Sequence, residues 1–531
     1  MSKSRLGLAV SFFALAVGVA PGAHAADTAA ALDALQKQID ALQKQLAELK
    51  AAQAKADREE KAERVVSQKE EPSPSEGSLR GVIKAKTGVD VTMGGFINAS
   101  TIFRTKNESA DAGSNFNTMI PFNNAANAHQ SEFRESARGS RLSLKAVGKP
   151  GKDATLTGYF EFDFLGAGST STQTQTNSYT PRVRHLFASY DDSASGWRMV
   201  AGQTWSLATM NAEGINPFKQ NIPMVQDSGF LPGVNFTRVP QLRVVKDFKD
   251  RHVSIGLSAE SPQMATAGIC TSSTATSIGN SPSTGTNPCS GATTAYSLVG
   301  AAFSGNLQGS ITTDIAPDMI VKATYDPGWG HYEVFGLTRV FHGLSGANNH
   351  NNMAFGGGIG AGASLPIVPK KVDLRANVLV GKGVGRYGAA QLPDVSVASD
   401  GKLKPLSQYT AMLGVVGRPS PSWDVFLYAG MEQAFRHSVA GVTNNVYGYG
   451  NFGVDNRGCS TSGSTTCYAQ TSSVWQVTAG LWHVFYEGDY GQAKIGLQHS
   501  WTRRNAFSDA NGINPHGIQN ISLLAIRYAP F

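Results

Sequence analysis

Charged residues are scarce in this chain. Asp, Glu, Lys and Arg make up 16% of its 531 residues, against about 25% in a typical soluble domain. The 46 Lys and Arg residues exceed the 39 Asp and Glu residues by seven, and this small excess is spread along the whole length. A protein that binds nucleic acid gathers its basic residues on one face, so we expect no nucleic-acid partner.

Long apolar runs are also missing after the N-terminus. A membrane-spanning helix needs about 20 consecutive apolar residues, and no such run follows residue 19. This excludes a polytopic helical membrane protein. Hydrophobic residues still make up 41% of the chain and are spread evenly. A β-barrel that crosses the membrane with strands is therefore not excluded.

The N-terminus has the features of an export signal. Lys3 and Arg5 precede an apolar stretch over residues 6–19, and Ala23-His24-Ala25 follows. A basic region, an apolar region and a small-residue cleavage site in this order are typical of a secretory signal peptide. A membrane anchor would need a longer apolar stretch. We therefore predict that residues 1–25 are a signal peptide and that the mature chain is exported.

Cysteine is rare as well. The four cysteines form two close pairs, Cys270 with Cys289 and Cys459 with Cys467, each in a stretch rich in Ser, Thr, Gly and Asn. In an oxidising exported compartment, local pairs in loops predict disulfides, because the bridge lowers the entropy of the open loop. A zinc site would need further His or Cys ligands nearby, so we expect no metal and no cofactor.

A heptad pattern occupies the first part of the mature chain. The apolar residues recur at alternating intervals of three and four, at Leu32, Leu35, Ile39, Leu42, Leu46 and Leu49. This pattern predicts a short parallel coiled coil within residues 26–71, and the mixture of Leu and Ile leaves dimer and trimer open. An amphipathic helix packed on its own domain would need a wider apolar face. Pro72 and Pro74 end the helix, and residues 72–88 form a linker.

From residue 89 to residue 531 the period changes from seven to two. In residues 155–164, polar residues such as Glu161 and Asp163 alternate with apolar residues such as Phe160 and Phe162, which predicts strands with one wet and one apolar face. Sixteen such segments start near Val89, Arg141, Ala154, Arg182, Trp197, Arg238, His252, Pro317, Gly330, Met353, Val372, Leu406, Trp423, Ser473, Gly491 and His516.

The connections between these segments alternate in length. The short ones span residues 148–153, 191–196, 247–251, 326–329, 366–371, 418–422 and 487–490, and the long ones include residues 104–140, 205–237, 261–316 and 437–472. Short turns at one rim, long loops at the other and an even strand number are typical of bacterial outer-membrane barrels. A soluble β-sandwich has no reason to place every long loop on one side. We therefore predict an all-β, sixteen-stranded antiparallel transmembrane β-barrel with an N-terminal α-helical coiled coil.

The end of the chain agrees only in part with such a barrel. The last residue is Phe531, as is common in outer-membrane barrels, and Leu524, Ile526 and Tyr528 share one parity. The parity of Phe531 includes Arg527 instead, so we expect a bulge or bend near Pro530.

The chain resembles the DcaP-like family of outer-membrane porins over nearly its whole mature length. The resemblance is carried by the heptad segment and by five strand motifs in order: Gly95-Phe96-Ile97, Gly139-Ser140-Arg141-Leu142, Glu161-Phe162-Asp163-Phe164, Arg182-Val183-Arg184-His185 and Gly202-Gln203-Thr204-Trp205-Ser206. It implies a sixteen-stranded barrel that trimerises in the Gram-negative outer membrane, a coiled coil in the periplasm, and uptake of small anionic solutes including dicarboxylates. The cysteine loops and Pro530 depart from the family pattern.

If the apolar parity faces lipid, the opposite parity faces the lumen. The basic residues on it are Arg141, Lys145, Arg182, Arg184, Arg243, Lys322, Arg375 and Lys494, and the acidic ones are Glu161, Asp163, Asp373, Asp424 and Glu432. Arginine presents a planar fork that matches carboxylates, so this excess favours anions. We expect Arg182 and Arg184 to be the best pair, with Arg141 and Arg243 on flanking strands of one sector, and Arg375 elsewhere on the wall. The alternative is that these arginines only pair with the carboxylates.

The loop over residues 205–237 carries Glu213, Lys219 and Asp227. A sixteen-stranded lumen is wide, so selectivity needs an inserted segment, and this loop is the candidate constriction with Lys219 as a pore residue. The alternative is an extracellular lid or a latch over a neighbouring subunit. We expect no enzyme, because no Gly-x-Ser-x-Gly elbow is present. The alternative to a porin is a structural or adhesive protein tethered by its coiled coil.

Overall fold

The structure is a computed structural model. It describes residues 82–84, 88–166, 179–248, 251–267, 314–345, 350–440 and 448–530. The predicted signal peptide and coiled coil, most of the linker, Cys270, Cys289 and Phe531 lie outside these residues. Within the described ranges, no helix is long and apolar enough to span a membrane.

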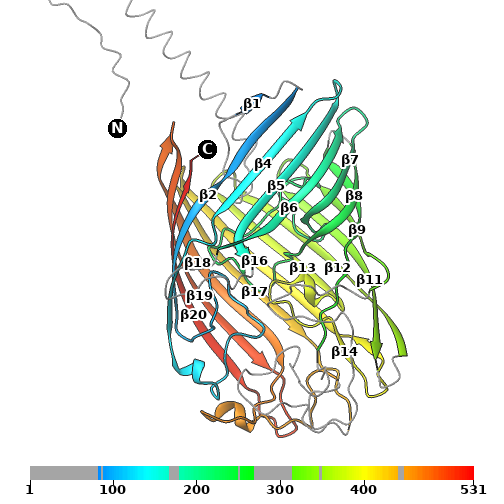
Figure 1. Cartoon of the computed structure of the whole chain (residues 1–531), viewed down its shortest axis with the longest axis vertical. Coiled ribbons are helices and arrows are strands. Elements are labelled where there is room, and N and C mark those ends of the chain that lie inside the picture. The colour runs from blue at the N-terminus through cyan, green and yellow to red at the C-terminus, as the bar shows by residue number, and fades with distance from the viewer. Residues whose placement is uncertain are drawn as a thin grey trace, which may run out of the picture. The chain divides into compact units, whose positions relative to one another are not determined.

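Sixteen antiparallel strands form a closed barrel (Figure 1). In chain order they are β2 (Val89–Arg104), β4 (Arg141–Gly148), β5 (Ala154–Gly166), β6 (Thr180–Asp192), β7 (Trp197–Trp205), β8 (Arg238–Phe248), β9 (Val253–Glu260), β10 (Asp318–Tyr325), β11 (His331–Ser345), β12 (His350–Val368), β13 (Val372–Lys382), β16 (Ser407–Ser420), β17 (Trp423–Ala434), β18 (Thr471–Gly488), β19 (Gly491–Ala506) and β20 (His516–Ala529). The ring closes because β2 pairs with both β4 and β20. The predicted barrel is confirmed, and no strand begins more than three residues from its predicted start.

Four short strands accompany the barrel. β1 (Val82–Lys84) lies in the segment predicted as linker and pairs with the start of β2. β3 (Glu132–Ser136) pairs with the end of β2, beyond the part that pairs with β4. β3 and β4 therefore occupy one position in the barrel, interrupted at residues 137–140. β14 (Val395–Val397) and β15 (Leu403–Pro405) form a separate two-stranded sheet within a loop.

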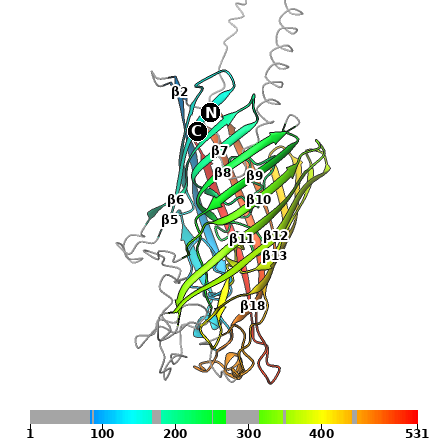
Figure 2. The same cartoon turned by 90° about the vertical axis from the view of Figure 1, so that its right-hand side faces the viewer.

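The two rims of the barrel differ as the sequence predicts. Short turns gather at the upper rim in Figure 1 and long connections at the lower rim, and Figure 2 shows the same division after a quarter turn. Two residues separate β16 from β17 and two separate β18 from β19, whereas residues 206–237 separate β7 from β8. The alternating chain lengths thus fix which strand ends meet at each rim.

The outer face of the barrel is apolar. On β8, Leu242 is 66% exposed while its neighbours Gln241 and Arg243 are buried, so the period of two separates an outer from an inner face. Exposed aromatic side chains lie near the short turns, among them Tyr190, Trp197, Tyr325, Trp423 and Tyr490, and near the long loops, among them Phe103, Phe133, Trp475 and Trp501. An apolar band between two aromatic girdles is typical of a barrel that faces lipid.

Candidate functional site

The connection over residues 206–237, here called the inner loop, lies inside the barrel. Its first half packs Leu207 and Ile215 against inward side chains of β8, β10, β11 and β13. Its second half packs Met224 and Leu231 against inward side chains of β16, β17, β18 and β20, including Trp482. Because these strands belong to different parts of the wall, the loop crosses the lumen.

Hydrogen bonds fix the inner loop at both sides. Near the short-turn rim, the Gly214 amide donates to Asp326 over 3.0 Å and Arg198 donates to the carbonyl of Ile215 over 2.8 Å. Across the lumen, the Trp482 indole donates to the carbonyl of Met224 over 3.0 Å. The loop therefore narrows the interior, as the constriction hypothesis requires, and is no extracellular lid.

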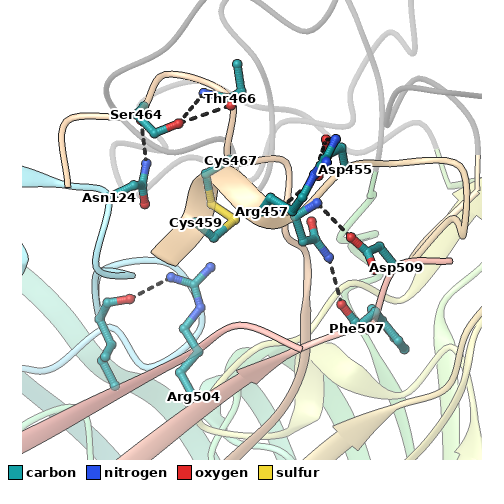
Figure 3. The surroundings of a disulfide bond; sticks show 12 residues. Asn124, Asp455, Arg457, Cys459, Ser464, Thr466, Cys467, Arg504, Phe507 and Asp509 are labelled. Carbon is teal, nitrogen blue, oxygen red and sulfur yellow. Dashed lines mark hydrogen bonds and ion pairs between the residues drawn. A yellow bond between two sulfur atoms is a disulfide. The ribbon is translucent and has the colours of Figure 1, made fainter. Parts of the chain in front are cut away.

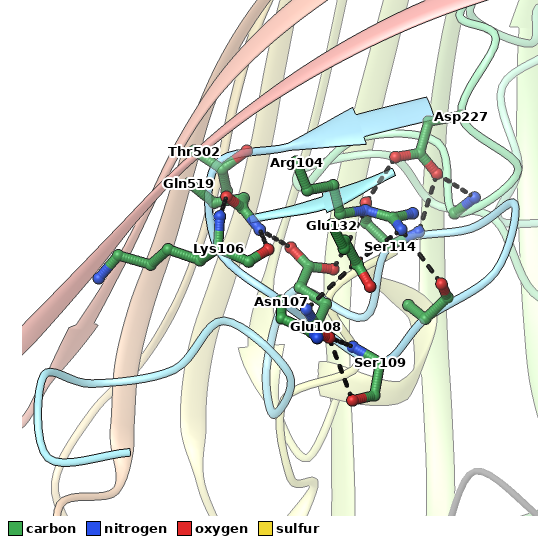
Figure 4. Close-up of polar contacts among 12 residues, drawn as sticks. Arg104, Lys106, Asn107, Glu108, Ser109, Ser114, Glu132, Asp227, Thr502 and Gln519 are labelled. Atoms are coloured by element: carbon green, nitrogen blue, oxygen red, sulfur yellow. Dashed lines mark hydrogen bonds and ion pairs between the residues drawn. The ribbon is translucent and has the colours of Figure 1, made fainter. Parts of the chain in front are cut away.

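The first long connection, residues 105–131, also turns inward (Figure 4). The Ser114 amide and hydroxyl donate to the Asp227 carboxylate over 3.0 and 2.7 Å, which joins this connection to the inner loop. Arg104 contacts Glu132 at 2.9 Å and Glu108 at 3.8 Å. One buried arginine thus serves two buried carboxylates, and burial raises the pKa of Glu108 to about 7 even though Arg104 lowers it.

A second charged group holds the loop over residues 383–406. Arg339 contacts Asp318 at 3.0 Å and Asp394 at 2.9 Å. Arg386 contacts Asp318 at 3.4 Å, and the Tyr387 hydroxyl donates to Asp318 over 2.9 Å. We call Arg339, Arg386, Asp318 and Asp394 the balanced cluster, because its two arginines meet two aspartates.

A third group lies where β4, β5, β6 and β8 meet the lumen. Arg184 contacts Glu161 at 2.5 Å and Asp163 at 3.1 Å, and Arg182 contacts Asp163 at 2.7 Å. Arg141 lies 3.9 Å from Glu161. Arg238 stacks on the Trp205 ring at 4.7 Å and lies within the electrostatic range of Arg184 and Asp163. We call Arg141, Arg182, Arg184 and Arg238, with Glu161 and Asp163, the arginine cluster.

The arginine cluster keeps buried guanidinium donors that form no hydrogen bond with the described residues. Arg141 Nη1, Arg184 Nη2 and Arg238 Nη1 are buried and have no hydrogen-bond partner among the described residues. A buried charged donor without an acceptor costs free energy. Four guanidinium groups face two carboxylates here, so the cluster carries excess positive charge and free donors that suit the oxygen atoms of an anion.

Arg527 extends this positive charge along the wall. Its guanidinium lies 4.1 Å from the Phe96 ring centre and 4.7 Å from that of Trp482, and it donates to Asn98 over 3.2 Å. Lys494 lies 4.9 Å from the same Trp482 ring. Leu524, Ile526 and Tyr528 face outward, so the parity of these three residues, rather than that of Phe531, would have identified Arg527 as a lumen residue.

The remaining predicted pore residues make other contacts. Arg243, on β8 in the same sector of the wall, donates to the carbonyl of Trp205 and to Gln241 and forms no ion pair with a carboxylate among the described residues. Arg375 lies on β13, 3.8 Å from Asp373, and its buried Nε and Nη1 atoms have no hydrogen-bond partner in the described ranges. Lys219 pairs with Glu213 at 2.8 Å within the inner loop.

The disulfide prediction is confirmed for one pair. Cys459 and Cys467 are bonded and buried in the long connection between β17 and β18 (Figure 3). The Asn124 side chain donates to the carbonyl of Ser464 over 3.0 Å, and the Asn124 amide donates to that of Cys459 over 3.1 Å. The disulfide thus stiffens a loop that contacts the first long connection. The predicted pair Cys270 and Cys289 lies outside the described residues.

The chain is similar to solved structures, whereas no protein-family model and no curated protein sequence matches it. The outer membrane channel DcaP of Acinetobacter baumannii is 17% identical, with a TM-score of 0.56 over 85% of this chain and 100% of that chain. The anion-selective porin from Comamonas acidovorans is 10% identical, with a TM-score of 0.41 over 83% and 99%. OprB of Pseudomonas putida is 10% identical, with a TM-score of 0.42 over 82% and 94%. The resemblance to DcaP is confirmed at the level of the fold.

Proposed function

We propose that this chain is an outer-membrane porin through which small anions, dicarboxylates among them, diffuse. The observation that carries the proposal is the charge of the arginine cluster, in which four guanidinium groups face two carboxylates and three of them keep buried donors without a hydrogen bond to the described residues. The apolar outer face and the barrel fold shared with the DcaP channel support a membrane location.

The positive side chains of the wall form a series rather than a single spot. From the arginine cluster, Arg141 lies over one side of Phe96 at 5.3 Å and Arg527 lies over the same ring at 4.1 Å. Lys494 follows over the Trp482 ring. Conduction requires several sites that bind an anion favourably but weakly, and such a series supplies them. In a confined lumen these charges are screened less than on an open surface.

The structural-pair alternative accounts for part of the cluster. Glu161 and Asp163 each accept ion pairs from arginines, and these contacts stiffen the wall. Two carboxylates neutralise only two of the four guanidinium groups, so the remaining charge is left to act on solutes. Arg182 and Arg184 therefore both stiffen the wall and contribute positive charge that attracts anions.

Assembly and location complete the proposal. We propose a homotrimer in the Gram-negative outer membrane, exported by residues 1–25, with the coiled coil of residues 26–71 in the periplasm and residues 72–88 as the linker that leads into the barrel of residues 89–531. The heptad pattern supports the oligomer, and the apolar girdled face supports contact with outer-membrane lipid.

Planar-bilayer conductance tests the proposal. In a potassium chloride gradient, the reversal potential of the purified protein should indicate a chloride-to-potassium permeability ratio above one. Replacing Arg182 and Arg184 together by Gln should lower that ratio and slow dicarboxylate uptake into liposomes. The matched control is Arg457→Gln, which removes an exposed arginine paired with Asp455. An unchanged ratio in the double variant would show that the pair is structural, and a protein without conductance would favour the structural or adhesive alternative.

A further inference from the structure

We propose that Phe96 and Trp482 are positioning residues of the channel, which hold Arg527 and Lys494 in the lumen by ring contacts instead of carboxylate contacts. This inference rests on the proposed function. On this proposal, two uncharged aromatic side chains keep the row of positive side chains along the wall continuous. Residues Arg527 and Lys494 are called the ring-held cations below.

The ring contacts are extensive. The Arg527 guanidinium lies between two rings, 4.1 Å from the centre of Phe96 and 4.7 Å from that of Trp482. The Lys494 ammonium lies 4.9 Å from the centre of Trp482, so one indole serves two cations. Phe96 also lies 5.3 Å from the Arg141 guanidinium, which links the ring-held cations to the arginine cluster.

In the described ranges, the contacts of Arg527 and Lys494 are with aromatic rings rather than with carboxylates. Neither Arg527 nor Lys494 forms an ion pair with any carboxylate in the part of the chain that the structure describes. Asp424 acts on Lys494 only at longer range, and it lies 3.4 Å from Arg418. A carboxylate would neutralise a cation, whereas the face of an aromatic ring attracts the cation and leaves its net charge intact. The ring-held cations therefore stay able to attract a passing anion.

The wall is built to hold the Trp482 ring in one orientation. Trp482 is only 2% exposed, and its indole donates to the carbonyl of Met224 in the inner loop. The ring lies against Gly496 of β19, where an added Cβ would come within 2.6 Å of the Trp482 ring. A side chain at position 496 would push the ring away from the wall, so glycine is required there for this packing.

These contacts explain how the positive series crosses from β6 to β19. The arginine cluster ends at Arg141 on β4, and the cations resume on β20 and β19. Phe96 on β2 touches cations on both sides of this gap, and Phe96 is 4% exposed. Apart from the rings, the hydrogen bond from Arg527 to Asn98 is the one polar contact with a side chain that these two cations make within the described ranges.

Aromatic-to-aliphatic variants test the proposal without removing a charge. Trp482→Leu and Phe96→Leu should each lower the chloride-to-potassium permeability ratio by about two- to fivefold, the change expected when a cation–π contact is lost. Trp482→Phe keeps a ring and should retain most of the ratio. Phe426→Leu is the matched control, because Phe426 packs in the same apolar cluster as Trp482 and carries no cation among the described contacts. Heat-modifiable migration on gels checks that each barrel is folded.

A double-mutant cycle separates positioning from a general structural role. In a background with Arg527→Gln and Lys494→Gln, Trp482→Leu should change the permeability ratio no further. An equal fall in that background would overturn the proposal, because Trp482 would then act through the inner loop. If the unmodified protein is anion-selective and Trp482→Leu and Phe96→Leu leave its permeability ratio unchanged, the positioning proposal is wrong and the proposed function still stands. A parent protein without anion preference would overturn the proposed function as well.

Discussion

Two groups of inward arginines lie in the same barrel and differ in their charge balance. In the balanced cluster, Arg339 and Arg386 meet Asp318 and Asp394. In the arginine cluster, four arginines share two carboxylates, and three of the arginines keep buried donors without a hydrogen-bond partner among the described residues. The difference teaches that an inward arginine is not by itself evidence of a solute site. An excess of positive over negative charge distinguishes a site for anions from a group of ion pairs that only stabilises the fold.

The first prediction breaks the balanced cluster and has the largest expected effect. Asp318 accepts contacts from Arg339, Arg386 and Tyr387. Asp318→Asn should lower the free energy of unfolding by about 3 to 5 kcal/mol, because removing one partner leaves buried charge uncompensated. Urea unfolding in detergent micelles measures this loss. Asp455→Asn, at an exposed pair, is the control, and a smaller loss than in that control would contradict the assignment.

The second prediction uses the group around Arg104, which contacts Glu108 and Glu132, while Arg134 also contacts Glu132 at 3.5 Å. Burial raises the pKa of Glu108 to about 7, from about 4.5 in the unfolded chain. A carboxyl whose pKa is raised by folding contributes stability below pH 4.5, and this contribution is lost as the pH rises through 7. We expect a loss of about 3 kcal/mol between these limits, since one pKa unit corresponds to about 1.4 kcal/mol.

Unfolding free energies at pH 5 and pH 8.5 test this sign. The parent protein should be less stable at the higher pH by more than the Glu108→Gln variant is, because the glutamine cannot ionise. Equal pH dependences in the two proteins would mean that Glu108 is ionised throughout and that Arg104 outweighs its burial.

The sequence predicted the barrel well because a period of two persists along wall strands such as β8 and β9. The outward Leu242 and inward Arg243 illustrate that rule. The alternation of inward and outward residues does not predict the direction of a side chain at the end of a strand. Arg238 opens β8 on the outward parity of Leu242, yet it lies over the Trp205 ring beside the arginine cluster, because the chain leaves the inner loop at that residue.

The grouping of the site was less predictable. Arg243 has the right parity, but its guanidinium donates to the carbonyl of Trp205, at the point where β7 ends and the inner loop begins. Contacts between loops, such as Ser114 with Asp227, join residues 113 positions apart. No periodicity records such contacts, because hydrogen bonds from irregular backbone have no repeat.

The third prediction sharpens the comparison at Arg238, which has no ion pair with a carboxylate in the described ranges. Arg238→Gln should therefore leave the unfolding free energy almost unchanged, in contrast to Asp318→Asn, while lowering the chloride-to-potassium permeability ratio. A unit charge about 10 Å from a passing ion contributes about 1.7 kcal/mol at an effective dielectric constant of about 20, so the ratio should fall by up to about twentyfold. Reversal potentials measure it. A destabilised variant with an unchanged ratio would place Arg238 with the structural arginines.

The last prediction has the smallest expected effect. It tests whether anion preference depends on the net charge of the arginine cluster or on the number of its arginines. Arg182 has 41% of its side chain exposed, against 17% for Arg141 and 3% for Arg184, and it pairs with Asp163 at 2.7 Å. Replacing Arg182 by Gln together with Asp163 by Asn removes one charge of each sign, and Arg184 keeps Glu161 as its partner. The excess of two positive charges is preserved, so the permeability ratio should change by less than about twofold, whereas Arg182→Gln alone should lower it more, since the field in the lumen depends on net charge. Reversal potentials of the single and double variants decide the matter. If both fall equally, the guanidinium of Arg182 contacts the anion directly, and the excess of charge is not what selects it.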